Sequence, residues 1–122
     1  MTDKTCLTFA SCLLALLGAP ATADPAEVVT AKASQNGSSW RVDVTLRHGD
    51  TGWEDYADGW RVEAPDGTVL GTRVLYHPHV EEQPFTRALT GVTLPPQLAE
   101  VHIRARTNTD GWAKTTFILK LP

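Results

Sequence analysis

Apolar and polar residues alternate along most of the chain after residue 23, at the two-residue period of a β-strand. The segment 40–46 is the clearest example, with apolar residues at every second position: Trp40, Val42, Val44 and Leu46. The same alternation returns in 60–64 and in 101–106. Because no helical periodicity follows residue 23, the pattern predicts an all-β domain.

Turn-forming residues, among them Asn36-Gly37, Asp66-Gly67 and Pro95-Pro96, divide this part of the chain into seven predicted strands. These are 26–33, 40–46, 60–64, 68–76, 86–92, 101–106 and 113–121. We expect two antiparallel sheets that enclose one core. The alternation predicts the buried residues: Trp40, Val42, Val44, Trp60, Val62, Val101, Ile103, Phe117 and Leu119.

The C-terminal third resembles a fibronectin type III domain. The motifs that carry the resemblance are Leu89-Thr90-Gly91-Val92 with Pro95-Pro96, the run 101–108, and Gly111-Trp112. Trp40 also matches a tryptophan that is common on the second strand of that family. The resemblance implies a seven-stranded, immunoglobulin-like antiparallel β-sandwich. Because the family is mostly structural and adhesive, the resemblance also argues against catalysis.

Residues 1–23 have the features of a signal peptide: a positive charge at Lys4, an apolar run centred on 13–17, and the cleavage motif Ala21-Thr22-Ala23. The run is too short to span a bilayer, so we expect no membrane insertion after signal cleavage. Residues 24–122 are expected to form one periplasmic or secreted domain. Both cysteines lie in the signal, so this domain has no disulfide. The net charge of −3 and the dispersed basic residues argue against nucleic acid as a partner.

Three predicted loops, 48–59, 77–84 and 107–111, should meet at one end of the domain, because successive antiparallel strands alternate in direction. They contain three of the four histidines. His77 and His79 form an H-x-H motif, and His48 is a candidate third ligand. Imidazole suits copper or zinc, and carboxylates could complete the shell or orient a ring. The alternative is that these histidines are structural and hydrogen-bond the backbone at strand ends.

A second hypothesis is a surface for an exported protein or glycan. Exposed aromatic residues often anchor interfaces. The candidates are Trp53, Tyr56, Trp60, Tyr76, Phe85 and Trp112, of which Trp60 is assigned to the core by its alternation. The carboxylates that could rim such a surface, or serve a metal site, are Asp50, Glu81, Glu82 and Asp110. The competing interpretation is that the aromatic residues form a small core under the long loop.

Catalysis is not expected. The mature chain has no cysteine nucleophile, no serine in a nucleophile-elbow motif and no glycine-rich phosphate loop after a strand. The sequence therefore predicts a non-catalytic binding module. A histidine-bound metal ion and an aromatic recognition surface remain the two alternatives.

Overall fold

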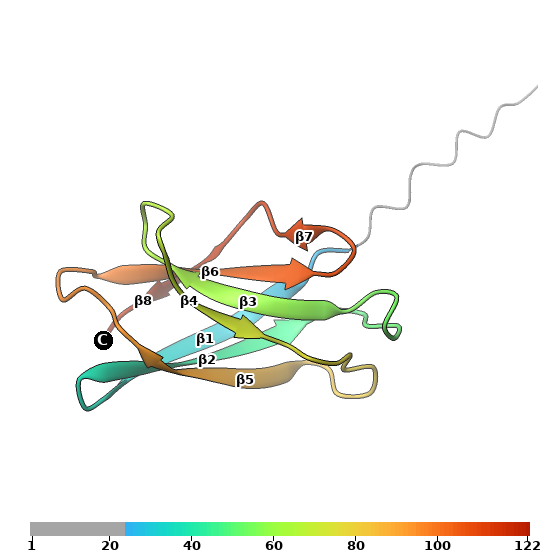
Figure 1. The fold of residues 1–122 in the computed structure, drawn as a ribbon, viewed down its shortest axis with the longest axis horizontal. Helices are drawn as coiled ribbons and strands as arrows, with labels where there is room; N and C mark the ends of the chain where they lie inside the picture. The colour runs from blue at the N-terminus through green and yellow to red at the C-terminus, as the bar shows by residue number, and fades with distance from the viewer. Residues whose placement is uncertain (1–23) are drawn as a thin grey trace, which may run out of the picture.

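The computed structural model describes residues 24–122, and the signal peptide predicted for 1–23 lies outside the described residues. Within 24–122 the chain forms eight β-strands and no helix (Figure 1). The strands are β1 (Glu27–Asn36), β2 (Ser39–Arg47), β3 (Ala57–Glu63), β4 (Val69–Val74), β5 (Phe85–Val92), β6 (Glu100–Thr107), β7 (Gly111–Trp112) and β8 (Phe117–Lys120). This confirms the all-β prediction for the described part of the chain.

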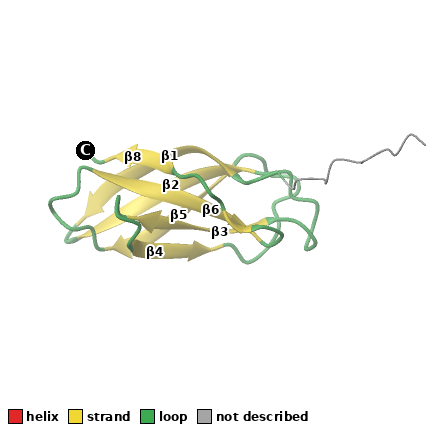
Figure 2. Ribbon diagram, turned by 90° about the horizontal axis from the view of Figure 1, so that it is seen from above, coloured by secondary structure: helices red, strands yellow, loops and turns green. Residues whose placement is uncertain are grey.

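The strands form two antiparallel sheets. The first has the order β1-β2-β5, and the second has the order β4-β3-β6, with β7 and β8 both pairing with β6. Figure 1 shows the second sheet above the first, and Figure 2, which looks down on them, shows most of the connecting loops at the two ends. Each sheet turns the apolar side of its strands toward the other, so one core lies between them.

Seven of the nine predicted core residues are buried, all but Trp40 and Phe117. Trp60 is fully buried and pairs with Ala105 on β6, which is also buried on the core side of the sheet. The prediction was wrong for Trp40 and Phe117, which are half-buried and pack against the edge of the core. Trp40 lies near the start of β2, beside a bulge, and Phe117 is the first residue of β8. The alternation predicted which face these residues occupy, but not that the sheets end there.

The last predicted strand, 113–121, is interrupted in the structure. β7 pairs with β6 at Arg106 and Thr107, and β8 pairs with β6 only up to Ile103. Between them, 113–116 has no apolar alternation that would hold it over the core. The carbonyl of Ala113 instead accepts a hydrogen bond of 2.7 Å from Arg104 Nη1. The seven predicted strands therefore become eight.

Apart from 113–116, which runs along the second sheet between β7 and β8, the connecting segments lie at two ends of the molecule (Figure 1). We call the end formed by 48–56, 75–84 and 108–110 the loop pole, on the right of Figure 1. The opposite pole, on the left, holds the turns at 37–38 and 64–68 and the connection 93–99. The predicted meeting of three loops at one end is confirmed. The first loop is shorter than predicted because β3 begins at Ala57.

Candidate functional site

A buried carboxylate holds the first two segments of the loop pole together. Asp50 Oδ1 accepts hydrogen bonds from His48 Nδ1 at 2.6 Å and from the amide of Ala57 at 3.0 Å. Its Oδ2 accepts one from the amide of His79 at 2.8 Å. The Asp50 side chain is 0% exposed. Because a buried carboxylate must be compensated by donors, these three contacts identify Asp50 as the structural centre of the pole.

His48 is enclosed in the same network. Its Nε2 lies 2.9 Å from the carbonyl of Asp24 and 3.6 Å from Asp55 Oδ1, while its Nδ1 faces Asp50. The His48 amide donates to Gln83 Oε1 at 3.0 Å. Both ring nitrogens thus contact oxygen atoms of the protein, so neither is open to an ion. The contacts of His48 are those of a structural residue that joins the start of the domain to the loops.

His77 and His79 lie side by side, with ring centroids 4.6 Å apart. The His79 ring is buried and stacks on Phe85, at a centroid distance of 3.9 Å and an interplanar angle of 9°. Its Nε2 accepts a hydrogen bond of 3.0 Å from Arg87 Nη2. Its Nδ1 is buried, with no hydrogen-bond partner among the described residues. His77 is exposed, and its Nδ1 donates to the carbonyl of Pro78 at 3.0 Å.

Burial is the main reason why the pKa of His79 is lowered, and the nearby Arg87 guanidinium lowers it further. Arg87 also hydrogen-bonds Glu82, and this bond lowers the pKa of that exposed carboxylate. His79 therefore favours the neutral form in the folded protein. A neutral ring can accept the hydrogen bond from Arg87, which a protonated ring cannot.

Asn108 attaches the third segment to the first. Its side-chain oxygen accepts from the amide of Tyr56 at 2.9 Å, and its Nδ2 donates to the carbonyl of Trp53 at 2.9 Å. The Asn108 amide also donates to the carbonyl of Tyr56 at 3.2 Å. Sequence reasoning missed this role because asparagine is expected in a turn for local reasons. Its position in the turn after β6, facing the long first loop, was the available signal.

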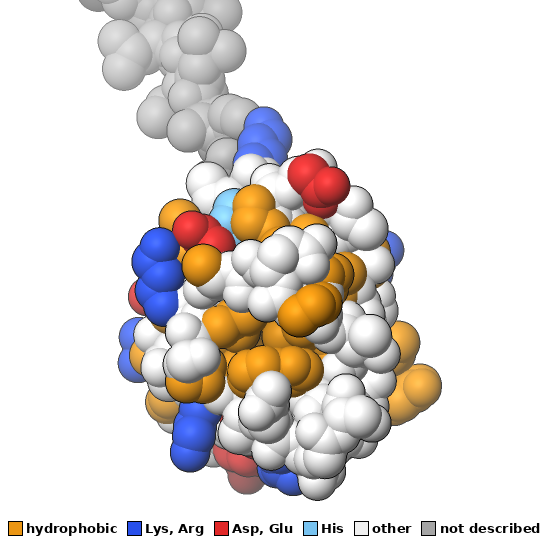
Figure 3. Space-filling model, turned by 90° about the vertical axis from the view of Figure 1, so that its left-hand side faces the viewer, with side chains coloured by type: hydrophobic (Ala, Val, Ile, Leu, Met, Phe, Trp, Pro, Cys, Tyr) orange, Lys and Arg blue, Asp and Glu red, His pale blue; other side chains and the backbone are white. Residues whose placement is uncertain are grey.

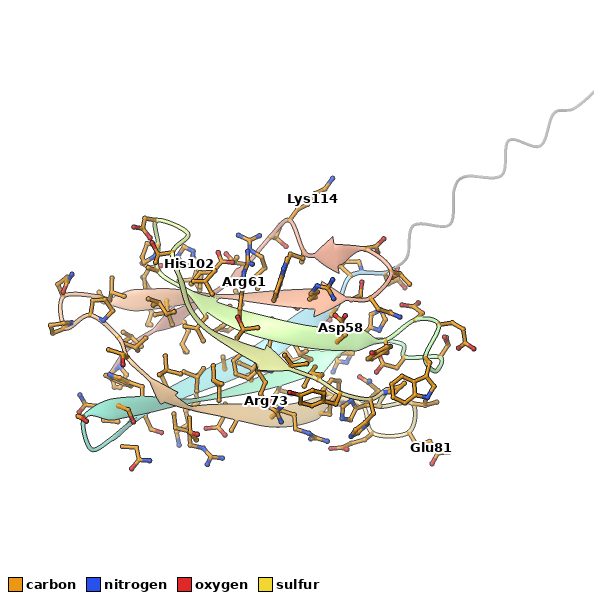
Figure 4. All side chains as sticks on the ribbon, in the orientation of Figure 1. Asp58, Arg61, Arg73, Glu81, His102 and Lys114 are labelled. Carbon is orange, nitrogen blue, oxygen red and sulfur yellow. The ribbon has the colours of Figure 1, made fainter. Side chains whose placement is uncertain are left out.

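Large apolar side chains lie exposed on this framework. Trp53 is 65% exposed, Tyr76 is 75% exposed and Val80 is 55% exposed. Trp53 and Tyr56 meet edge to face, with ring centroids 5.6 Å apart. The carboxylates of Glu81, Glu82 and Asp110 are exposed as well, and Figure 4 shows Glu81 pointing outward from its loop. Tyr76 was among the aromatic residues considered for a recognition surface, whereas Val80 was not among the predicted site residues.

Trp112 lies apart from these aromatic residues, on the outer face of the second sheet. Its ring is 4.1 Å from the guanidinium of Arg61 and 5.8 Å from that of Arg106. Figure 4 shows Arg61 projecting from that outer face. Beside it, buried Glu63 accepts hydrogen bonds from Arg61 Nε at 2.6 Å and Arg104 Nε at 2.7 Å. Arg104 is the main reason why the pKa of Glu63 is lowered.

The predicted histidines do not assemble a three-ligand metal centre. Within 24–122, no group of three or more His, Cys, Asp or Glu side chains is placed to share one ion. His77 and His79 are brought together, whereas His48 is bonded to oxygen atoms on both sides. Copper or zinc binding through His77 and His79 therefore stays a prediction.

The sequence matches no protein-family model and no solved structure. It is similar to a protein of Halomicrobium mukohataei described as "Putative lipoprotein", with 36% identity over 86 residues. The matched region is 70% of this chain and 42% of that protein, so the chain spans less than half of the relative's length. Separately, residues 24–122 include no helix of the length and hydrophobicity that crossing a membrane requires.

Proposed function

We propose that this chain is an exported, non-catalytic binding module that recognises a protein partner through the loop pole. The observation that carries the proposal is the exposure of Trp53, Tyr76 and Val80 at one end of a small domain. Exposed aromatic side chains contribute much of the binding energy in protein interfaces. A partner that covers these side chains would remove apolar surface from water, which favours binding.

The framework beneath these side chains supports the proposal. Asp50 and Asn108 hold the three loop segments together through hydrogen bonds to the backbone. A loop that is already ordered loses less conformational entropy when it binds, so more of the contact energy contributes to affinity. The pole thus combines an ordered backbone with exposed contact residues.

The charge of the loop pole indicates the kind of partner. Glu54, Glu81 and Asp110 are exposed there, and Arg87 is hydrogen-bonded to Glu82. A partner with an apolar patch bordered by Lys or Arg would complement this surface. A glycan would use the same aromatic residues and is the alternative outcome of the test below.

The wider assignments belong to the same proposal. We infer an immunoglobulin-like sandwich of the fibronectin type III kind, and the two antiparallel sheets β1-β2-β5 and β4-β3-β6 support it. The name of the Halomicrobium mukohataei relative supports export, and with it a periplasmic or secreted location. The predicted signal peptide points the same way.

The test is cross-linked capture from the cell envelope fraction, using the processed protein as bait. The double variant Trp53→Ala, Tyr76→Ala should lose the captured partner. Val69→Ala, Ile118→Ala, which removes two exposed apolar side chains outside the pole, should keep it. Equal capture by both variants would contradict the proposal. Oligosaccharide binding that is lost in Trp53→Ala, Tyr76→Ala and kept in Val69→Ala, Ile118→Ala would assign the pole to a glycan instead.

A metal ion is the second candidate ligand, favoured by one observation. The rings of His77 and His79 lie side by side, and His79 Nδ1 is buried without a hydrogen-bond partner in the described part of the chain. Because Nε2 accepts from Arg87, Nδ1 carries the ring proton, so an ion bound at Nδ1 would displace that proton and break the bond from Arg87. Cu(II) or Zn(II) at a hundredfold excess over the dissociation constant should then stabilise the fold by about 2.7 kcal/mol. His77→Ala should abolish the shift in melting temperature and Trp53→Ala should keep it. No shift in the unmodified protein would exclude this candidate.

A further inference from the structure

A hollow of about 660 Å³ opens at the opposite pole, far from the loops described above. Figure 3 faces this pole and shows apolar side chains gathered around a depression that is open to solvent. Trp40, Leu94, Pro95 and Leu98 supply apolar walls. They come from the start of β2 and from the connection between β5 and β6.

Trp40 is the residue that links this hollow to the core. Its place in the alternation of β2 is a core position, in phase with Val42 and Val44. It is nevertheless only half-buried, because it packs against the core and also lines the hollow. An indole at the mouth of the core offers a rigid apolar surface to a ligand at little cost in side-chain entropy.

The side chains that line the hollow are uncharged, and this limits the class of ligand. None of the residues that line the hollow has a charged side chain. Because no Lys, Arg or His side chain lines it, an anionic ligand would lose hydration without gaining an ion pair. Gln35 and Ser38, both exposed, place an amide and a hydroxyl among the lining residues. These groups suit a neutral ligand that has hydroxyl groups of its own.

We propose that the hollow binds a neutral oligosaccharide. The apolar face of a sugar ring would lie on the indole of Trp40 and on the neighbouring proline, while its hydroxyls meet Gln35 and Ser38. An acyl chain fits less well, because burial stabilises an apolar ligand in proportion to the area removed from water, and this hollow is open. The site is separate from the loop pole and independent of the function proposed for it.

A second hollow of about 300 Å³ extends the site. It lies beside the turn at 64–68 and shares Pro95 and Leu98 with the first. The two hollows therefore meet at these two residues, and the second is also lined by the exposed carboxylate of Asp66. A neutral chain of several sugar units could extend from one hollow into the other.

The test is an NMR titration of the processed, isotope-labelled protein with uncharged trisaccharides. Cellotriose, maltotriose and triacetylchitotriose are the probes, and dodecanoate represents an acyl chain. At least one trisaccharide should shift the amide resonances of 35–40 and 94–98 and leave those of 50–56 unchanged. Shifts with dodecanoate alone, shifts centred elsewhere, or no shift with any trisaccharide would overturn the proposal.

Variants separate binding from folding. Trp40→Phe keeps a ring against the core and should weaken binding of the responding trisaccharide about tenfold, which corresponds to about 1.4 kcal/mol. Gln35→Ala changes an exposed residue and should weaken binding while the remaining resonances stay in place. Trp53→Ala at the loop pole is the matched control and should bind as the unmodified protein does. Unchanged binding by both Trp40→Phe and Gln35→Ala would also overturn the proposal.

Discussion

The two poles of this domain are built on different physical principles. At the loop pole, buried polar groups hold the segments together: Asp50 alone accepts three hydrogen bonds from residues of two loops and the start of β3. At the opposite pole, the walls combine apolar side chains with the uncharged polar groups of Gln35 and Ser38, and a hollow remains between them. The loop pole therefore depends on directional bonds, whereas the opposite pole depends on packing at the open end of the core.

This difference affects how each pole responds to change. A hydrogen-bond network is all or none, because removing one buried partner leaves the others unsatisfied. Apolar packing loses stability in proportion to the area and volume removed. The loop pole can consequently present exposed aromatic residues on a fixed backbone, and the opposite pole can tolerate variation in the residues that line its hollow.

The largest expected effect is that of Asp50→Ala. The change leaves His48 and two buried amides without their acceptor, so we expect a loss of about 3–5 kcal/mol in the free energy of unfolding. Urea denaturation followed by tryptophan fluorescence measures it. The control Asp110→Ala removes an exposed carboxylate of the same pole and should change stability by about 0.5 kcal/mol or less. Equal effects of the two changes would mean that the Asp50 network is not what orders the pole.

Trp40→Ala should be the most damaging single change at the opposite pole, and still less damaging than Asp50→Ala. Trp40 is half-buried, so we expect a loss of about 1–3 kcal/mol, below the roughly 3–5 kcal/mol typical of a fully buried tryptophan. Trp60→Ala, at 0% exposure, supplies that upper reference in the same denaturation experiment. If Trp40→Ala destabilised the protein as much as Trp60→Ala, Trp40 would be as tightly packed as a fully buried core residue, and the expected difference between the two would be wrong.

The sequence predicted the middle of the molecule better than either pole. Period-two alternation is a direct consequence of burying one side of a strand, so Val42, Val44 and Ile103 were placed correctly. It contains no information on where a sheet ends. Trp40 and Phe117 were therefore expected to be fully buried, although both lie at strand ends.

The candidate site was predicted in outline only. Strand direction was enough to bring the three loops together, but the partners of each side chain depend on distances in space. His48 was assigned from its residue type, whereas its ring contacts the backbone carbonyl of Asp24, which a sequence does not mark. Likewise, Asp50 binds the amide of His79, which lies 29 residues away in the chain. Tyr76 was considered for the aromatic surface, and its exposure continues the alternation of β4, in which Val74 is exposed and the following Leu75 is buried.

The pH dependence of stability should distinguish the loop pole from the rest of the fold. The ring of His79 is buried against Phe85, and the charged or titratable groups around it are Arg87, His77, Glu82 and Asp50. Its folded-state pKa lies below the unfolded value of about 6.5, so the unfolded chain binds more protons as the pH falls below that value. Stability present above about pH 6.5 should decline below it, by at most about 1.4 kcal/mol per pH unit for one proton.

His79→Phe is the informative variant, because it keeps a ring against Phe85 and removes the titrating group. Histidine titrates near pH 6.5, so the free energy of unfolding is measured between roughly pH 5 and 7. For His79→Phe it should vary less with pH than for the unmodified protein. His102→Gln, on the second sheet, keeps His79 and should retain the slope. An unchanged slope in His79→Phe would assign the pH dependence to other groups.

The smallest expected effect on stability belongs to the most exposed ring of the first loop. Trp53 is 65% exposed and meets Tyr56 only at an edge, while the backbone around it is held by Asn108. Trp53→Ala should therefore change the free energy of unfolding by about 0.5 kcal/mol or less. The same variant should markedly weaken binding of any partner that covers the loop pole. Both quantities can be measured on one preparation, by urea denaturation and by titration with the captured partner. A loss of several kcal/mol in stability would mean that Trp53 belongs to the framework, and the division between ordering groups and contact groups at this pole would fail.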